Sequence, residues 1–370
     1  MIPLLALCLT APLEFGLQQL PEDSPYRSEG FTKFVDVIAP NGKPIRIIAQ
    51  KGVRDIAVAR CENLLKFYLT DVPGTKYGSD KSAVANSMAN NHAMLMMPEG
   101  EHQEGEEPEI HAQPQFESET PVDGSRWYIR NDWEHRDAAF EEIFHLVHDT
   151  GIGTYDPGAL PQYQKELQDE AIKSLSDGRW GIPIDPHVKE WIEELRQEDS
   201  LAQEYIASVI DSYYGLWAAF DENPGGMWGI YIAKTRKEIK EKDPKGYALL
   251  ESFLPPMMHG YESLIDPSFR DTFSLQFNEE IAYTHKSQYY VDATLTGKKH
   301  SNILGNQEDN TLKGNSGNNT LDGGEGNDTV IFQGKKEEYI IEGEVIKDTV
   351  KGRDGTDTLI SIERVQFAKD

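Results

Sequence analysis

A short segment of apolar, acidic and histidine residues carries the clearest chemistry in this sequence. It covers residues 140–148 and reads FEEIFHLVH. At about 100° per residue, as on an α-helix, Glu141, His145 and His148 fall on one face and the apolar side chains fall on the opposite face. Two ligands four residues apart, with a carboxylate directly after the first, are typical of a zinc-binding helix that activates water.

Each polar residue of the segment has a position in the zinc-binding pattern His-Glu-x-x-His. Glu141 stands at the first ligand position in place of His, Glu142 at the position of the general base, and His145 at the second ligand position. His148, one turn further, could replace the missing imidazole. Because Glu-Glu-x-x-His alone is a weak pattern, the alternative is an ordinary amphipathic helix whose polar face is solvated.

A third ligand is expected from a second helix over residues 200–214. Ser200 is suited to be its N-cap, and Glu204, Ser208 and Asp211 form a polar line at i, i+4 and i+7. We expect Glu204 to complete the zinc site and Asp211 to support the ligands from one or two turns along. The alternative is that Glu204, in the first turn, only complements the helix dipole.

Near the C-terminus the composition changes to Gly, Asn and Asp with a period of nine residues. The segments 303–311, 312–320 and 321–329 each begin with an aliphatic residue, and Val330 continues the series. The pattern resembles the haemolysin-type calcium-binding repeats, which form a β-roll. Glycines allow turns that direct carbonyl oxygens inward and Asp adds a carboxylate, while Ca²⁺ prefers six to eight such oxygens. The alternative, a Gly/Asn-rich linker, does not explain the regular aliphatic positions.

Because the third repeat alone is complete, we expect one or two good calcium sites and not a long array. The residues predicted to bind calcium lie in the second and third repeats: Gly314, Gly317, Asn319, Asp322, Gly323, Gly324, Gly326 and Asp328.

The charge balance limits the classes of partner. The net charge is −27, from 36 basic and 63 acidic residues, which argues against nucleic acid or an anionic membrane as a partner. No run beyond the N-terminus approaches the roughly 18 apolar residues of a membrane helix, so no membrane insertion is expected. The two cysteines, Cys8 and Cys61, do not form a disulfide framework if the first is removed with a leader. The composition suits a secreted, extracellular protein that binds calcium or tolerates salt.

The expected fold is an α+β domain, mostly helical in its second half, followed by a short parallel β-roll and a C-terminal β region. Its expected segments are 1–23, an apolar leader or N-terminal arm; 24–296, the α+β domain with an acidic loop or lid at 98–123; 297–332, the calcium-binding roll; and 333–370, a β cap. This last segment resembles the tails of proteins exported by type I secretion, which implies a secretion signal near the C-terminus. The opening of the chain lacks a basic n-region and is a poor signal peptide as written.

Local patterns predict most of the regular elements. Strands are expected at 45–50, 92–97 and 127–130, and helices at 53–69, 81–88, 163–176, 186–198 and 200–214. The region 217–265 is expected to be helical with loop interruptions, and residues 24–41 show no clear period.

Taken together, these features resemble the gluzincin-type metallopeptidases, in particular the anthrax lethal factor-like peptidase domain. In that family His-Glu-x-x-His is followed, some tens of residues later, by a helix with a ligand Glu beside aromatic and small residues. The run 204–207, Glu-Tyr-Ile-Ala, is similar in place and character. The likeness covers roughly residues 40–250. It implies a zincin-like fold, a zinc ion and a protein or peptide substrate.

The sequence departs from that family in two ways. With Glu141 in place of His, two carboxylates would bind one dication, which should weaken its Lewis acidity and raise the pKa of the bound water. An upstream Tyr that would stabilise the oxyanion is also missing, and Tyr205, Tyr213 and Tyr214 are the candidates to replace it.

The leading hypothesis is a secreted zinc peptidase with a calcium-stabilised tail, in which Glu142 takes the proton of the attacking water. The alternative is a zincin-fold protein that has lost catalysis and acts as an extracellular, calcium-dependent binding or adhesion module. A third option is manganese or iron at the cluster of residues 141–149, because oxygen ligands shift metal preference toward harder ions. The sequence gives no indication of an oligomeric state.

Overall fold

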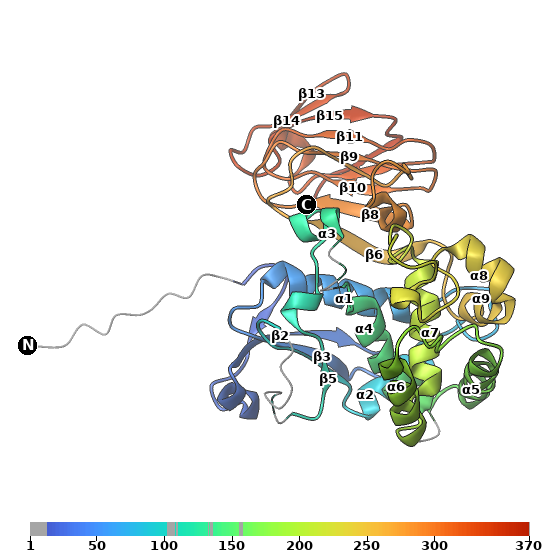
Figure 1. The fold of residues 1–370 in the computed structure, drawn as a ribbon. Helices are drawn as coiled ribbons and strands as arrows, with labels where there is room; N and C mark the ends of the chain where they lie inside the picture. The colour runs from blue at the N-terminus through green and yellow to red at the C-terminus, as the bar shows by residue number, and fades with distance from the viewer. Residues whose placement is uncertain are drawn as a thin grey trace, which may run out of the picture.

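The chain folds into an α+β part followed by a roll of parallel strands (Figure 1). In the computed structural model the described residues are 13–101, 108, 110–131, 133, 136–154 and 158–369. About half of the predicted leader and the middle of the predicted acidic loop lie outside them. The mixed α+β class and the parallel strands of the repeat region confirm the predicted fold at this level.

A five-stranded mixed sheet, ordered β1-β2-β3-β4-β5, forms the base of the first part. The first three strands pair antiparallel and the last three pair parallel. The strands are β1 (Gln18–Gln19), β2 (Phe31–Ile38), β3 (Pro44–Gln50), β4 (Met94–Met97) and β5 (Gln113–Pro114). β5 lies at the edge of the sheet, so one of its sides has no strand partner among the residues that the structure describes.

Alternation along the strands buries both faces of the sheet. Ile45 and Ile47 face the main core, against the helices α1, α2 and α4, whereas Ile48 and Met96 belong to a smaller apolar cluster on the opposite face.

The helices follow the apolar periodicity of the sequence closely. They are α1 (Asp55–Leu69), α2 (Ser82–Asn90), α3 (Arg126–Arg130), α4 (Ala139–Val147), α5 (Pro161–Ser176), α6 (Pro186–Gln197), α7 (Leu201–Tyr213), α8 (Arg236–Lys242), α9 (Pro244–Glu251) and α10 (Thr284–Ser287). The five helices predicted with explicit bounds are confirmed within a few residues.

Three local predictions are wrong. The expected strand at 127–130 is helix α3, because the side chain of Ser125 accepts a hydrogen bond from the Tyr128 backbone N–H at 3.2 Å and starts a helix. The end of the region expected to be helical is strand β6 (Met258–Ile265), which forms by pairing with a strand of the roll. Residues 24–41, which show no period, contain the long strand β2.

The roll consists of two parallel sheets that face each other. One is ordered β16-β12-β10-β8-β6, and the other is ordered β13-β14-β15-β11-β9-β7, with an antiparallel hairpin at its outer edge. The remaining strands are β7 (Thr272–Ser274), β8 (Tyr290–Leu295), β9 (Asn302–Leu304), β10 (Thr311–Lys313), β11 (Thr320–Asp322), β12 (Thr329–Ile331), β13 (Tyr339–Glu342), β14 (Val345–Asp348), β15 (Thr356–Ile360) and β16 (Arg364–Gln366).

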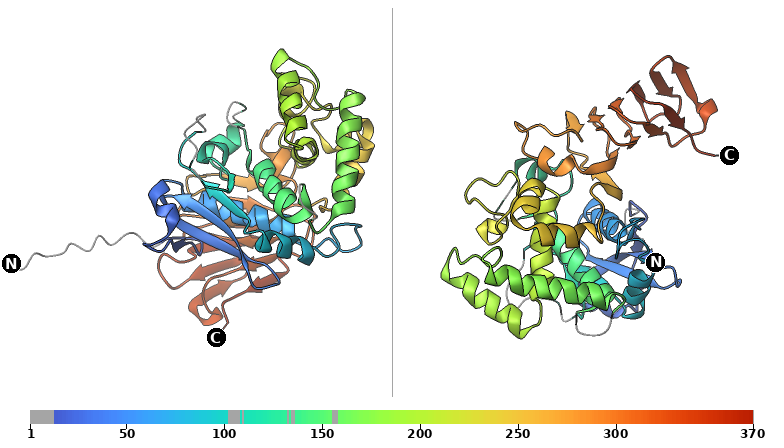
Figure 2. Two further views of the ribbon diagram at one scale, coloured as in Figure 1. Left: turned by 90° about the horizontal axis from the view of Figure 1, so that it is seen from below. Right: turned by 90° about the vertical axis from the view of Figure 1, so that its right-hand side faces the viewer.

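The aliphatic residue of each repeat packs inside the roll. Ile303, Leu312, Leu321 and Val330 are all buried. Successive repeats alternate between the two sheets, so that Thr311 pairs with Thr329 of the second repeat along. Figure 2 shows the strands stacking outward, away from the helices.

The roll is larger than the predicted segment 297–332. Strands β6, β7 and β8 precede that segment, and β15 and β16 follow it after the hairpin, yet all five belong to the same two sheets. The predicted boundary at 297 therefore runs through the sheets of the roll.

Buried polar contacts join the roll to the α+β part. The carboxylate of Asp123 is buried and accepts hydrogen bonds from the Tyr261 hydroxyl and, at 2.8 Å, from the Ser263 hydroxyl, both on β6. The prediction of a surface lid at 98–123 does not hold for its second half, since Gln115 is also buried there and β5 joins the sheet.

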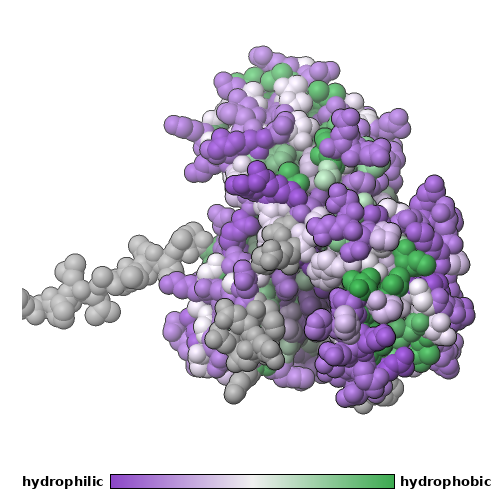
Figure 3. Space-filling view, in the orientation of Figure 1, coloured by the Kyte–Doolittle hydropathy of each residue, from purple (hydrophilic) through white to green (hydrophobic). Residues whose placement is uncertain are grey.

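The surface agrees with the composition. The face seen in Figure 3 is mostly hydrophilic, as the net charge of −27 predicts. Among the described residues, no helix has both the length and the apolar character needed to cross a bilayer. Cys61 is a buried free thiol on α1, and Cys8 lies outside the described residues.

A candidate metal centre between two helices

Helices α4 and α7 pack against each other and bring together Glu141, His145 and Glu204. One ligand atom of each residue lies within 4.8 Å of the other two. Nε2 of His145 is 3.5 Å from Oε1 of Glu204. The three residues that the sequence places at the core of a metal site thus converge on one point.

The cluster is shielded from water. Glu141 and His145 are 4% and 5% exposed, and the Glu204 side chain is 16% exposed. Although Nε2 of His145 is buried near a carboxylate, it makes no hydrogen bond. A buried ring nitrogen without a hydrogen bond, beside two carboxylates, fits the donor set of a divalent metal.

An arginine that the sequence reasoning missed balances part of the charge. The guanidinium of Arg136 forms an ion pair with Glu141 and lies 3.7 Å from Oδ2 of Asp211. Burial alone would raise the pKa of Glu141, but Arg136 and then His145 outweigh it and lower this pKa. The sequence holds no signal for this pair, because Arg136 precedes the helix and matches no ligand position.

Bound protons balance part of the remaining negative charge of the cluster. Burial opposes the charge of His145, but the carboxylates of Glu204, Glu142 and Glu141 outweigh it and raise the pKa of His145 to about 10. Burial raises the pKa of Glu204 to about 8, against the attraction of His145. An ion-free cluster therefore holds protons at neutral pH, and a divalent cation would displace them.

Glu142 lies beside the cluster, where the sequence places the general base. Its Oε2 accepts a hydrogen bond of 2.6 Å from Nε2 of Gln113 on the edge strand β5, and it lies 3.6 Å from Nδ1 of His145. The side chain is partly exposed, so water and substrate can reach it. The contact with Gln113 could not be foreseen, since that residue lies in the predicted acidic loop.

The structure does not bring His148 into the cluster. This residue is buried, its Nε2 contacts the side-chain oxygen of Gln164 on α5, and burial lowers its pKa to about 4. After α4, a π-helical turn continues the helix over His148–Gly153. A Cβ atom on Gly151 would lie 2.8 Å from side-chain atoms of Val84 and Met88, so glycine is needed there for packing against α2.

Asp211 is buried and accepts a hydrogen bond of 3.2 Å from the Trp217 indole. Arg136 contacts the carboxylates of both Asp211 and Glu141. Asp211 is therefore linked through Arg136 to the predicted ligand that it was expected to support.

The three tyrosines considered for the oxyanion bind other groups. The hydroxyls of Tyr205, Tyr213 and Tyr214 donate to Asp243, Glu251 and the carbonyl of Pro255 at 2.7, 2.8 and 2.6 Å. Because each hydroxyl has another partner, these contacts give no support to any of the three as the replacement of the missing Tyr.

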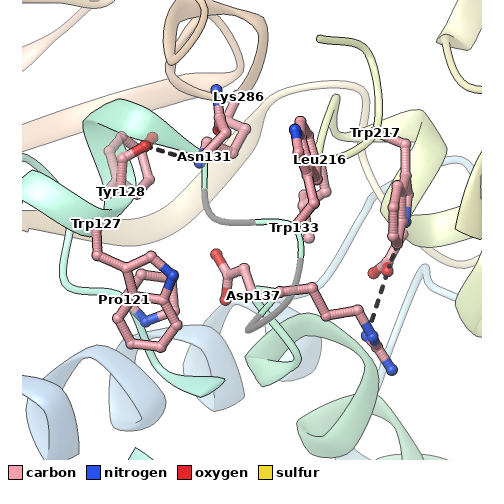
Figure 4. A pocket seen from close by; sticks show the side chains of 11 residues that line it. Pro121, Trp127, Tyr128, Asn131, Trp133, Asp137, Leu216, Trp217 and Lys286 are labelled. Carbon is pink, nitrogen blue, oxygen red and sulfur yellow. Dashed lines mark hydrogen bonds and ion pairs between the residues drawn. The ribbon is translucent and has the colours of Figure 1, made fainter. Parts of the chain in front are cut away.

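A small cavity of about 20 Å³ adjoins the cluster through Arg136 and Asp211. Figure 4 shows its aromatic walls, with Trp127 on one side and Trp133 and Trp217 on the other. A cavity of this size has room for about one water molecule.

The predicted calcium residues lie in two turns of the roll. Gly314, Gly317 and Asn319 are in the turn after β10, and Gly323, Gly324, Gly326 and Asp328 are in the turn after β11. The carboxylate of Asp328 is buried, and its Oδ2 has no hydrogen-bond partner. Asp322 lies at the end of β11, where its Oδ1 accepts a hydrogen bond of 3.2 Å from the Gly324 N–H.

Comparison with known proteins gives a match in the repeat region and none over the helical cluster. Residues 302–332 match the family model of the RTX calcium-binding nonapeptide repeat, in four copies. Neither a curated protein nor a solved structure matches this chain. The matched repeats support calcium binding, and such repeats are typical of secreted proteins.

Proposed function

We propose that the chain is a secreted zinc-dependent peptidase whose tail is stabilised by calcium. The observation that carries the proposal is the approach of His145 Nε2 to within 3.5 Å of Glu204, from a different helix and without a hydrogen bond. Glu141, four residues before His145, supplies the third ligand atom. The resemblance to lethal factor-like peptidases points to the same residues.

Glu142 carries the acid–base chemistry. Zinc at this cluster would polarise the peptide carbonyl and acidify a water molecule. Glu142 takes a proton from the water that attacks the carbonyl and returns a proton to the leaving amine. Arg136 supports this chemistry by offsetting the charge of Glu141, which would otherwise weaken the metal as a Lewis acid.

The edge strand favours an extended peptide as substrate. Strand β5 has one unpaired side, and its Gln113 contacts the proposed base Glu142. An extended chain can add to such an edge by main-chain hydrogen bonds.

One observation favours a second candidate, an inactive extracellular binding module. The ion pair between Arg136 and Glu141 satisfies that carboxylate without a metal. In this case the cluster would be a buried charge network, and calcium alone would bind to the protein. Manganese or iron remains the alternative metal if the oxygen ligands decide the preference.

Elemental analysis and a peptide-hydrolysis assay on the full chain test the proposal. We expect zinc near one per chain in the unaltered protein and in Glu142→Gln, loss of zinc in His145→Ala, and loss of hydrolysis in both variants. Glu190→Gln, at an exposed glutamate on α6, is the matched control. Calcium without zinc, or hydrolysis that persists in Glu142→Gln, would refute the peptidase.

A further inference from the structure

The turns of the roll are of two chemical kinds. Counted from the glycine that opens each turn (Gly305, Gly314 and Gly323), the second and sixth residues are Asn306 and Asn310, then Asn315 and Asn319, then Gly324 and Asp328. In these three turns asparagine occurs together with asparagine, and glycine occurs together with aspartate. This covariation within one chain suggests that the two kinds of turn are held differently.

A further repeat lies beyond the matched segment 302–332. Residues 352–360 read GRDGTDTLI, and their strand β15 stacks on β11 with Leu359 opposite Leu321. Asp357 stands at the sixth position of this repeat, with Arg353 instead of glycine at the second. The hairpin β13–β14 separates it from the other repeats along the chain but not in space.

In the first asparagine turn, amide groups satisfy the backbone oxygens. Nδ2 of Asn310 donates to the carbonyl of Val291 and to Oδ1 of Asn306, both at 2.9 Å, while its Oδ1 accepts from the Asn306 N–H at 2.9 Å. Nδ2 of Asn306 donates to the carbonyl of Tyr290 at 2.9 Å. Both side chains are buried, and all their polar atoms are used.

The second asparagine turn repeats this arrangement. Nδ2 of Asn319 donates to the carbonyl of Ser301 at 2.8 Å and to Oδ1 of Asn315 at 3.2 Å, while its Oδ1 accepts from the Asn315 N–H at 2.9 Å. Nδ2 of Asn315 donates to the carbonyl of Lys299 at 3.0 Å. Amide hydrogens thus point at the carbonyl oxygens, and a cation would have to displace them.

The aspartate turns are incomplete without a cation. Oδ1 of Asp328 accepts from the Asn310 N–H at 2.8 Å, and Oδ1 of Asp357 accepts from the Asn319 N–H at 2.9 Å. Oδ2 of each aspartate is buried and has no hydrogen-bond partner. A buried carboxylate oxygen without a donor is costly unless a cation neutralises it.

Glycine allows oxygen atoms to gather closely beside Asp328. A Cβ atom on Gly323 would collide with both Oδ2 of Asp328 and the carbonyl oxygen of Ser361, so these two oxygens lie near each other. Carboxylate and carbonyl oxygens are the ligands that Ca²⁺ prefers. A Cβ atom on Gly314 would lie 2.9 Å from Oδ2 of Asp357, so this oxygen also lies close to a glycine backbone.

We propose that Ca²⁺ binds at Asp328 and Asp357, in the outer coils, and that paired asparagines replace calcium in the inner coils. The inner asparagines, Asn310 and Asn319, bridge to the coil that begins with β8, next to the α+β part. The outer aspartates hold the end of the roll, including the hairpin. Asn319 therefore substitutes for calcium and is not a calcium ligand through its side chain, in contrast to the sequence prediction.

Calcium counting on the full-length protein tests the proposal. The number of Ca²⁺ ions bound per chain is measured by equilibrium dialysis. The value for the unaltered protein is subtracted from that of each variant, so an ion bound at the Glu141 cluster does not affect the comparison. Asp328→Asn and Asp357→Asn should each remove one Ca²⁺, because asparagine supplies its own donors. The double variant Asn306→Gly with Asn310→Asp should add one. Asp169→Asn, at an exposed aspartate, is the control.

Either aspartate variant with an unchanged calcium count would overturn the proposal, and so would Asn319→Ala with a lowered count. Hydrogen exchange gives a second readout that does not depend on the variants folding. When calcium is removed from the unaltered protein, amides of β15 and β16 should lose protection while those of β8 and β10 keep it. Equal loss throughout the roll would contradict the division into inner and outer coils.

Discussion

The helical cluster and the outer coils of the roll both hold buried atoms without hydrogen bonds, but they differ in what balances their charge. In the cluster, Arg136 forms an ion pair with Glu141. Around Asp328, the charged groups that act on its pKa are other carboxylates, Glu363 first, and with burial they raise it. We therefore expect the cluster to persist without an ion, whereas the outer coils should depend on one. Metal loss should remove chemistry from the first region and structure from the second.

The largest expected effect is the loss of peptide hydrolysis when the proposed base Glu142 is replaced. Glu142→Gln keeps the shape and the contact with Gln113 but cannot accept a proton, so kcat for peptide hydrolysis should fall by about 10²–10⁴-fold. Zinc content and the unfolding midpoint should stay unchanged, as measured by elemental analysis and thermal melting. A variant that loses zinc together with activity would show that Glu142 is a ligand and not the base.

The charge-balancing role of Arg136 predicts the next largest effect. Arg136→Met leaves Glu141 buried and unpaired, which should lower the free energy of unfolding of the metal-free protein by about 3–5 kcal/mol. Zinc should restore part of this loss, because it would neutralise the same carboxylate. Denaturant unfolding with and without zinc measures both values, with the exposed Arg196→Met as control. An equal loss in both states would mean that no cation reaches Glu141.

The comparison also explains which features the sequence could predict. The aliphatic residues at 303, 312, 321 and 330 define the roll because each repeat places the same residue type at the same position. The cluster ligands were predicted from helical spacing on α4 and from one carboxylate on α7, since a helix fixes which residues share a face. In both regions, local periodicity was enough.

Features that depend on packing between distant segments were not predicted. Strand β6 exists because it pairs with β8, and Gln113 reaches Glu142 because β5 joins the sheet beside α4. Arg136 pairs with Glu141 across a loop, without any fixed spacing. The further repeat at 352–360 escaped detection because the hairpin β13–β14 interrupts the nine-residue period before Asp357.

Ion-free outer coils should become less stable as pH rises. Burial, with Asp354 and Asp348 nearby, raises the pKa of Asp357 to about 8 in the ion-free protein, above its ordinary 3.8. The folded state then binds a proton that the unfolded state releases. Stability from this group is therefore complete below about pH 4 and is lost as pH rises through about 8, by roughly 1.4 kcal/mol per unit.

Thermal melting of calcium-free protein across this range measures the loss. Saturating Ca²⁺ should remove the contribution of Asp357, because the ion takes the place of the proton. Asp357→Asn should show a smaller slope than the unaltered protein, since Glu204 also titrates near pH 8. An unchanged slope in Asp357→Asn would assign the titration to another group.

The smallest effect concerns the contact that joins the sheet to the cluster. Gln113 donates to Glu142 at 2.6 Å from the edge strand, so it orients the carboxylate without touching the predicted metal ligands. A hydrogen bond to a charged group contributes about 1.5–3 kcal/mol, and part of this would be regained from water at a partly exposed site. Gln113→Ala should therefore lower kcat by about tenfold and leave zinc content unchanged. A fall in zinc content together with kcat would contradict this role.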